Sequence, residues 1–277
     1  MAINAEIFMC AHSSVPVLPP LCTCVQGGAR LNPPLPGALP DYGEGGGISE
    51  KNPAYCELTV QYFAWKNKDL DAYGFCHYRR LFSFNEDIKK PYVTLGKIPK
   101  GKGEYYLGSE EKIRKTIEEN PVIVPRCEDV GMSVYEKYIS SAHHHREDID
   151  LFLKLIKEHY PYLSPYADEY MSQNKQYFCN MFIMEKKLFY EYSSALFTLL
   201  EAFDKLKKPH GVFQADRVDG YLGERFLGIY IHYLKSKGIR IHHVARIDID
   251  CSLGKRIVNW LLPPETKRRF FFKRIFK

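Results

Sequence analysis

Short, almost wholly apolar runs recur along the chain, separated by longer stretches in which apolar and polar residues mix. Such runs are typical of strands that are buried on both faces of a sheet. The first run ends at His12, and the run 73–76 stops abruptly at a polar cluster. Strands are predicted at 3–11, 73–76, 121–125, 178–184 and 239–244.

The longer stretches between these strands repeat apolar residues at helical spacing. Asn52-Pro53 has the composition of a helix start, with Asn at the N-cap and Pro at the first helical position. Gly238 is suited to end the last helix. Helices are predicted at 52–65, 110–119, 135–160 with a break near His143, 186–206 and 220–237. Because strands alternate with helices, we expect an α/β fold with a mostly parallel central sheet.

Two segments do not fit this alternation. Residues 13–47 are rich in Pro and Gly, and a loop of this length is usually functional or mobile. Residues 84–108 are polar and suggest an excursion or hairpin. No internal repeat interrupts the pattern. The simplest division is therefore one domain over residues 1–260, followed by a basic and aromatic tail over residues 261–277.

Charge is concentrated at the C-terminal end. The net charge of the 277 residues is +6, and the segment 267–277 combines most of that excess with four Phe residues. The remainder is close to neutral, which argues against binding of nucleic acid by the whole protein. The tail composition suits an anionic membrane surface, but a packed helix or a disordered end is equally compatible.

The cysteines and the N-terminus indicate the compartment. Eight cysteines occur without a Cys-x-x-Cys pair, and several lie inside apolar runs, which favours reduced, buried thiols. No leader peptide is apparent at the N-terminus, and no apolar run reaches the length of a membrane span. These features predict a cytoplasmic protein.

Polar clusters at the ends of strands are the first candidates for chemistry, because ligands of parallel α/β sheets bind at the carboxyl ends of strands. His77-Tyr78-Arg79-Arg80 follows the run 73–76 directly. Adjacent arginines can bind a diphosphate through charge-assisted, bidentate hydrogen bonds. The alternative is a basic surface turn whose arginines pair with nearby carboxylates.

Two further segments carry candidate groups. Asn180 lies in the apolar run 178–184, where its amide must find partners and serves either to hold a loop or to contact a sugar hydroxyl. The segment 216–225 places acids and arginines at a predicted helix start, where a carboxylate could act as general base. Asp219 could instead cap that helix.

Metal binding has no clear signature. His143-His144-His145 precedes Glu147-Asp148, but consecutive histidines on a helix point in different directions and rarely bind one ion. The short Asp-x-Asp patterns at 69–71, 148–150 and 248–250 do not follow a buried strand as a nucleotide-sugar metal site would. The sequence leaves the metal requirement open.

Three of these segments together resemble a known family. The runs 48–59, 65–67 and 74–80 are similar to the capsular and exopolysaccharide glycosyltransferases catalogued as the domain-of-unknown-function 4422 family, and weaker similarity extends from about residue 7 to about residue 249. The resemblance implies a GT-A-like fold and inverting transfer of a hexose from a nucleotide sugar. It makes UDP-galactofuranose a leading candidate donor, with Mn²⁺ or Mg²⁺ undecided.

The resemblance also implies roles for individual residues. In this interpretation cationic side chains after the run 73–76 take over part of a metal's work on the leaving diphosphate. Glu224 is the predicted general base, with Asp216 and Asp219 as substitutes. The predicted donor-binding residues are His12, Asn52, Tyr55, Glu57, His77, Tyr78, Arg79, Arg80, Arg217 and Arg225. The predicted acceptor-binding residues are Asn180, Met181, His144 and Asp148.

The resulting hypothesis is a bacterial hexosyltransferase that extends a cell-surface polysaccharide such as capsule or O-antigen. Its partners would be a UDP-sugar and a lipid-linked or oligosaccharide acceptor, and its tail could hold it on the inner face of the cell membrane. Two rival hypotheses are a non-catalytic module that binds nucleotide sugars or glycans, and a peripheral membrane protein that acts mainly through its tail.

Overall fold

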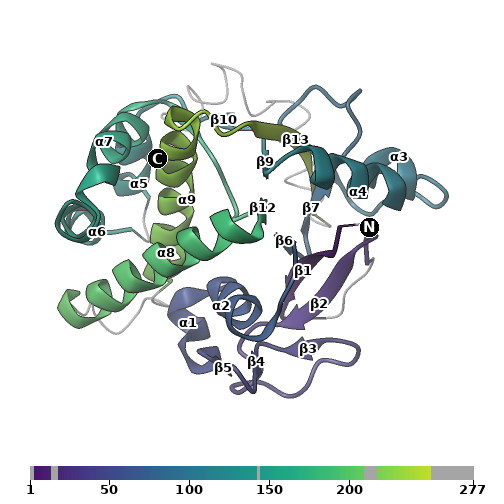
Figure 1. Ribbon diagram of the computed structural model, residues 1–277, viewed down its shortest axis with the longest axis horizontal. Helices are drawn as coiled ribbons and strands as arrows, with labels where there is room; N and C mark the ends of the chain where they lie inside the picture. The colour runs from purple at the N-terminus through teal and green to yellow at the C-terminus, as the bar shows by residue number, and fades with distance from the viewer. Residues whose placement is uncertain (1–2, 14–17, 142–143, 209–216, 251–277) are drawn as a thin grey trace.

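A nine-stranded mixed sheet forms the centre of the computed structural model, which describes residues 3–13, 18–141, 144–208 and 217–250 (Figure 1). One half of the sheet is parallel. Strand β1 (Ala5–Ala11) pairs with β2 (Cys22–Gln26) on one side and with β6 (Ala72–His77) on the other. A two-residue strand, β3 (Leu39–Pro40), extends this half beyond β2. The carboxyl ends of β1 and β6 therefore lie side by side.

The other half of the sheet closes on itself. Strands β6, β12 (Phe182–Glu185), β9 (Val122–Pro125), β13 (Ile241–Ile249) and β7 (Arg80–Ser83) pair in a ring, because β7 pairs back onto β6. Within this ring only β9 and β13 are parallel. The prediction of a mostly parallel, GT-A-like sheet is therefore wrong, since β7 and β12 run opposite to their neighbours. The coarser prediction of a single α/β domain is confirmed for the described residues.

The remaining elements frame the sheet. A parallel strand, β8 (Tyr92–Leu95), lies beside β13. Two small antiparallel pairs are formed by β4 (Tyr42–Gly43) with β5 (Gly46–Gly47) and by β10 (Glu128–Asp129) with β11 (Lys175–Gln176). The helices are η1 (Ser49–Lys51), α1 (Asn52–Tyr55), α2 (Leu58–Asn67), α3 (Gly103–Leu107), α4 (Glu110–Glu119), α5 (Val134–Ile139), α6 (Arg146–His159), η2 (Pro161–Leu163), α7 (Ser164–Ser172), α8 (Lys186–Leu206) and α9 (Val218–Ser236).

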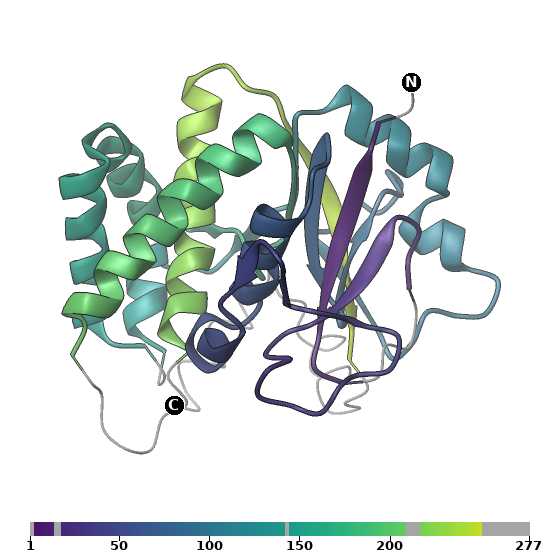
Figure 2. The ribbon, with the colours of Figure 1, turned by 60° about the horizontal axis from the view of Figure 1, so that its bottom comes forward.

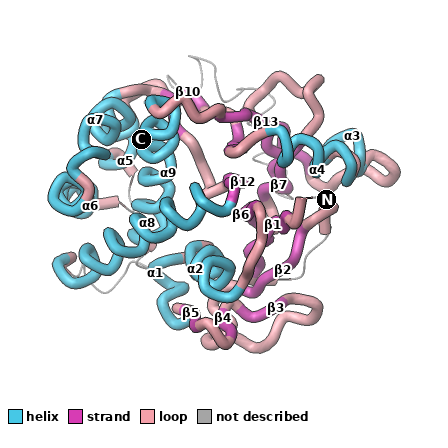
Figure 3. Tube along the Cα trace, viewed as in Figure 1, coloured by secondary structure: helices cyan, strands magenta, loops and turns pink. Residues whose placement is uncertain are grey.

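Helices cover both faces of the sheet (Figures 2 and 3). Phe8 and Phe75 point into a large core shared with α2, α6, α8 and α9, whereas Ile7 and Cys76 point into a smaller core shared with α3 and α4. This alternation follows from the two-residue period of a strand. Because both faces are buried, these strands are the nearly continuous apolar runs of the sequence.

Most predicted elements are present, and the differences have local causes. Helices α4 and α8 begin and end where the sequence predicts them. The predicted strand 178–184 begins only at Phe182, because Cys179 and Asn180 have left-handed φ angles of 73° and 46°. Asn52 is the first residue of α1 rather than its cap, and its Nδ2 donates to the Cys56 carbonyl at 2.8 Å.

The Pro- and Gly-rich segment 13–47 is an ordered part of the fold where the structure describes it. It contributes strands β2 to β5. The carboxylate of Asp41 is fully buried and accepts hydrogen bonds from the backbone amides of Gly28 and Ala29 and from the Ser49 hydroxyl. One buried carboxylate thus organises the loop against η1.

All seven cysteines in the described ranges are free thiols, as predicted; Cys251 lies outside those ranges. None of the described helices combines the length and the apolar composition needed to cross a membrane. The predicted tail, residues 261–277, also lies outside the described residues.

Helix α9 packs unusually closely against its neighbours through three glycines. A Cβ atom on Gly220 would lie 3.1 Å from Cys56 Sγ, and one on Gly223 would lie 2.8 Å from Leu58 Cδ1. A Cβ atom on Gly228 would overlap the buried ring of Tyr170. These glycines let α1, α2 and α7 approach the backbone of α9.

We predict that Gly228→Ala lowers the free energy of unfolding by about 1–3 kcal/mol, because the new methyl group must displace a packed tyrosine ring. Gly103→Ala is the matched control, since nothing lies within 4 Å of a Cβ atom at that helical position. Urea unfolding followed by circular dichroism measures both. Equal stability of the two variants would contradict the close packing at Gly228.

Candidate active site

A polar cleft of about 370 Å³ opens where the carboxyl ends of β1 and β6 meet the N-terminal end of α9. It is lined from five separate parts of the chain. The lining residues are Cys56, Glu57, His77, Arg79, Arg80, Lys137, Ser141, His144, Phe178, Cys179, Arg217, Gly220, Tyr221, Glu224 and Arg225. The cleft therefore brings together about half of the residues that the sequence singled out, from separate segments.

One side of the cleft is cationic. It carries the guanidinium groups of Arg79 and Arg80, from the turn between β6 and β7, and that of Arg217, from the residue preceding α9. The backbone amide of Arg79 donates to His77 Nδ1 at 3.3 Å. Three guanidinium groups together with the N-terminus of a 19-residue helix form a setting that favours a multiply charged anion.

A buried ion-pair network holds Arg80. Asp248 lies opposite Arg80 in the pairing of β13 with β7, and its Oδ1 lies 3.5 Å from Arg80 Nε. The same carboxylate accepts from the buried Arg246 at 2.6 and 3.1 Å, and Arg246 also pairs with Glu128 at 2.8 Å. Two carboxylates thus balance two guanidinium groups, and Arg80 is oriented toward the cleft by its partner on β13.

The histidines at the strand ends are neutral at physiological pH. Burial, reinforced by Arg80, Arg79 and the nearby ring of His12, lowers the pKa of His77 to about 3. Burial also lowers the pKa of His12, whose ring centroid lies 6.4 Å from that of His77. Because His77 Nδ1 accepts a hydrogen bond, the neutral ring carries its proton on Nε2. His77 is therefore a neutral donor among cations.

Two adjacent residues in left-handed conformations hold the acidic side of the cleft. The backbone amide of Cys179 donates to Glu224 Oε1 at 2.5 Å. The next side chain, Asn180, donates from Nδ2 to Glu57 Oε1 at 2.8 Å and to the Gly220 carbonyl at 3.0 Å. Cys56, which precedes Glu57, also has a positive φ of 51°. Unfavourable backbone conformations of this kind are common at functional sites.

A third wall comes from the end of α5 and the segment that follows it. The His144 ring packs between the rings of Tyr138 and Tyr221, with centroid separations of 4.3 and 4.2 Å, and its Nδ1 lies 3.0 Å from the Tyr138 carbonyl oxygen. Lys137 and Ser141 line the same wall. Stacked aromatic rings beside polar groups are well suited to contact a sugar.

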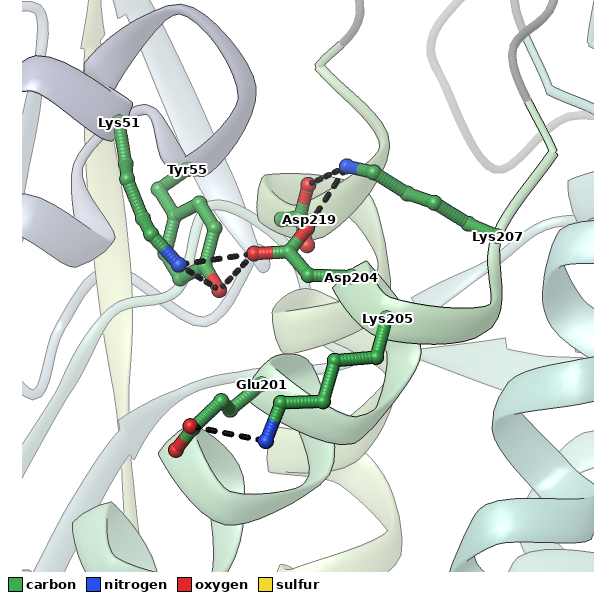
Figure 4. Close-up of polar contacts among 7 residues, drawn as sticks. All are labelled: Lys51, Tyr55, Glu201, Asp204, Lys205, Lys207 and Asp219. Carbon is green, nitrogen blue, oxygen red and sulfur yellow. Dashed lines mark hydrogen bonds and ion pairs between the residues drawn. The ribbon is translucent and has the colours of Figure 1, made fainter.

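Two residues predicted for the site, Tyr55 and Asp219, lie outside the residues that line the cleft, in a network shown in Figure 4. The Tyr55 hydroxyl donates to Asp204 at 2.8 Å, and Lys51 pairs with the same carboxylate at 2.9 Å. Lys207 joins Asp204 to the buried Asp219 at 2.8 and 3.0 Å. Tyr55 and Asp219 therefore tie α1, α8 and α9 together.

The other predicted residues occupy varied positions. Met181 is a fully buried core residue, and Asp148 is buried in the first turn of α6. His12 and Tyr78 adjoin His77 behind the cleft lining, and Asn52 supports the turn between α1 and α2. Asp216 lies outside the described residues.

Sequence reasoning missed some of the lining. Cys179 is next to the predicted Asn180, and Tyr221 lies two residues after the predicted Asp219, so the sequence located these segments but not every group that lines the cleft. Cys56 supplies a thiol that accepts from Arg217 Nε at 3.2 Å. Lys137 and Ser141 lie in a stretch that was predicted to be helical, and no motif around them indicated a binding role. Only the packing of α5 against α7 and α6 brings them to the cleft.

The donor groups of the cleft do not suit a divalent metal ion. Glu57 accepts from Asn180, Glu224 is paired with Arg225, and most of the other charged groups in the lining are cationic. Within the described ranges, no three or more His, Cys, Asp and Glu side chains are grouped so that they could hold a metal ion. No step of the mechanism below is therefore assigned to a metal.

Comparison with known proteins agrees with this geometry at the level of class. Residues 6–236 match the family described as "Domain of unknown function (DUF4422)", and the chain belongs to that family. The structure is similar to that of "WbbM bifunctional glycosyltransferase" without ligand, with a TM-score of 0.83 and 27% sequence identity. The match covers 89% of this chain but only 45% of that protein. No curated protein sequence matches.

This similarity suggests a role related to glycosyl transfer. The cleft is the candidate active site, because it brings together the segments through which the sequence resembles the same family. The similar structure is more than twice as long as the matched region.

We predict that the imidazole of His77 stays neutral from about pH 8 down to about pH 4, because its pKa is about 3 in the folded protein. The unfolded chain binds a proton near pH 6.5, so His77 makes the protein less stable as the pH falls from about 6.5 to about 3. NMR titration of the histidine rings measures the pKa, with exposed His159 as the control. Titration of His77 near pH 6.5 would contradict its environment.

Proposed function

We propose that this chain is an inverting glycosyltransferase that moves a hexose from a nucleoside diphosphate sugar to an acceptor hydroxyl. The single observation that carries the proposal is that one cleft brings the guanidinium groups of Arg79, Arg80 and Arg217 together with the carboxylates of Glu57 and Glu224. Such a combination suits a reaction in which a diphosphate leaves from one side while a proton is removed on the other.

The cationic side would bind the leaving group. Arg79, Arg80 and Arg217 would contact the diphosphate oxygens, and the Nε2 hydrogen of His77 would add a neutral donor. As the bond between the anomeric carbon and the phosphate oxygen breaks, its electron pair passes to that oxygen. Preorganised cations stabilise the negative charge that develops there, which is the usual role of such groups in transfer from phosphate esters.

The acidic side would bind and activate the acceptor. The acceptor hydroxyl oxygen attacks the anomeric carbon from the face opposite the diphosphate, so the configuration inverts, and a carboxylate takes the hydroxyl proton. The sequence prediction assigns this role to Glu224. His144, between Tyr138 and Tyr221, lies where an acceptor sugar could stack.

The family resemblance makes UDP-galactofuranose the first donor to test and a lipid-linked or oligosaccharide intermediate of a cell-surface polysaccharide the first acceptor. We also propose, from the sequence alone, a cytoplasmic protein associated with the inner face of the membrane. The basic and aromatic residues of the segment 261–277 support this placement because they suit an anionic surface.

We predict that the wild-type protein releases UDP from a UDP-sugar when an acceptor is present, and that Arg79→Ala or Arg80→Ala lowers kcat by about 10²–10³-fold. The loss is expected because each substitution removes positive charge opposite the leaving diphosphate. A coupled UDP-release assay over a panel of nucleotide sugars measures it. Arg114→Ala is a suitable control, since Arg114 lies on α4, outside the cleft lining, and pairs with Glu110.

The same assay separates the proposal from its main rival. A non-catalytic binding module would show a thermal shift with a nucleotide sugar but no UDP release with any acceptor. Full activity of both arginine variants would instead show that the cationic side does not contact the leaving group.

A further inference from the structure

The two carboxylates of the cleft have different surroundings. Both oxygens of Glu224 are engaged: Oε1 accepts from the Cys179 amide at 2.5 Å, and Oε2 pairs with Arg225 and lies 3.5 Å from Gln176 Nε2. Arg225 is itself only 3% exposed. A carboxylate whose two oxygens are both held by protein donors has little room to accept a hydrogen bond from an acceptor hydroxyl. These contacts make Glu224 a structural anchor for the loop at Cys179.

Glu57 lies in the same cleft without a close ion-pair partner in the described residues. Its side chain accepts a hydrogen bond from Asn180, and that amide is fixed in turn by its second bond, to the Gly220 carbonyl. Gly220 and Gly223 have no side chains, so Cys56 and Leu58 can pack directly against the backbone of α9. Glu57, which lies between them in the sequence, can therefore approach the N-terminal end of that helix. Glu57 is therefore positioned as firmly as Glu224, but its charge is not neutralised.

We propose that Glu57, rather than Glu224, is the general base that takes the proton from the acceptor hydroxyl, and that Asn180 is its positioning residue. This inference rests on the proposed glycosyltransferase function. As the hydroxyl oxygen forms its bond to the anomeric carbon, the proton moves to a Glu57 carboxylate oxygen. The bond to the diphosphate breaks at the same carbon, and the diphosphate leaves toward Arg79 and Arg80.

The surroundings of Glu57 make it a stronger base than an ordinary exposed carboxylate. Burial raises the pKa of Glu57, and the negative charge of Glu224 acts in the same direction. The Asn180 hydrogen bond and Arg217 lower it. The other titratable groups that interact with Glu57 are the thiols of Cys10 and Cys56 and the phenol of Tyr192, which are neutral near pH 7 because their pKa values are raised. Activity should therefore fall on the acid side as Glu57 becomes protonated.

The first experiment compares Glu57→Gln with Glu224→Gln in the full chain. We expect Glu57→Gln to lower kcat by about 10²–10⁴-fold, because the amide cannot accept the proton, while affinity for the donor stays unchanged. Glu57→Asp should restore part of kcat. Donor affinity is measured by calorimetry with the UDP-sugar that the wild type uses. Glu201→Gln is the control, since Glu201 is exposed and pairs with Lys205 alone among the described residues (Figure 4).

The second experiment measures the pH profile of kcat. In the wild type, kcat should fall at low pH, which gives the profile an acid limb. This limb should be absent from the residual activity of Glu57→Gln and present in Glu224→Gln. Asn180→Gly keeps the left-handed backbone without strain and removes the hydrogen bond that lowers the pKa of Glu57. Its acid limb should therefore move to higher pH, a shift that a merely structural role for Asn180 would not produce.

Three outcomes would overturn the inference: wild-type kcat in Glu57→Gln, an acid limb that persists in Glu57→Gln but vanishes in Glu224→Gln, or an unchanged limb in Asn180→Gly. If Glu57→Gln does not fold, as judged by circular dichroism, the Asn180→Gly profile decides alone. Failure of the proposed function is distinguishable, because the wild type would then release no UDP from any nucleotide sugar.

Discussion

The close approach of α9 to the turn between α1 and α2 is the constraint on which the site depends. Gly220 and Gly223 leave no side chain between the two segments, so the strained residue Cys56 can turn the chain and direct Glu57 into the cleft. The Asn180 amide then bridges Glu57 to the Gly220 carbonyl. A larger residue at either glycine would separate these groups and dismantle the acidic side.

The opposite side of the cleft depends on the closure of the sheet. Strand β7 turns back from β6 and pairs with β13, which sets Arg80 opposite Asp248. The buried Arg246 neutralises part of the charge on Asp248. Asp248 therefore holds Arg80 in place but neutralises only part of the positive charge of Arg80. The antiparallel pairing that the sequence pattern did not predict is thus what orients the proposed diphosphate contacts.

Local patterns predicted the elements well. Amphipathic periodicity located α4 and α8 to the residue, because their apolar faces pack on one side against the sheet layer. The pattern could not give strand direction, since β12 is as apolar as the strands it pairs with, and it did not predict the short strand β7. The pattern also wrongly placed Asn180 inside a strand, because its neighbours in the sequence are apolar. In the structure Asn180 has a left-handed conformation, and its side chain contacts Glu57 and Gly220, which are both distant in the sequence.

For the site, the sequence by itself determined the chemical groups: a basic cluster after one strand, acids and arginines at the start of one helix, and the family to which they point. Only the tertiary structure decided their partners. It assigned Asp219 and Tyr55 to a network with Lys207 and Asp204, paired Glu224 with Arg225, and left Glu57 facing the cleft. The reason is physical: a carboxylate's role depends on burial and on neighbouring charges, and those neighbours come from distant parts of the chain.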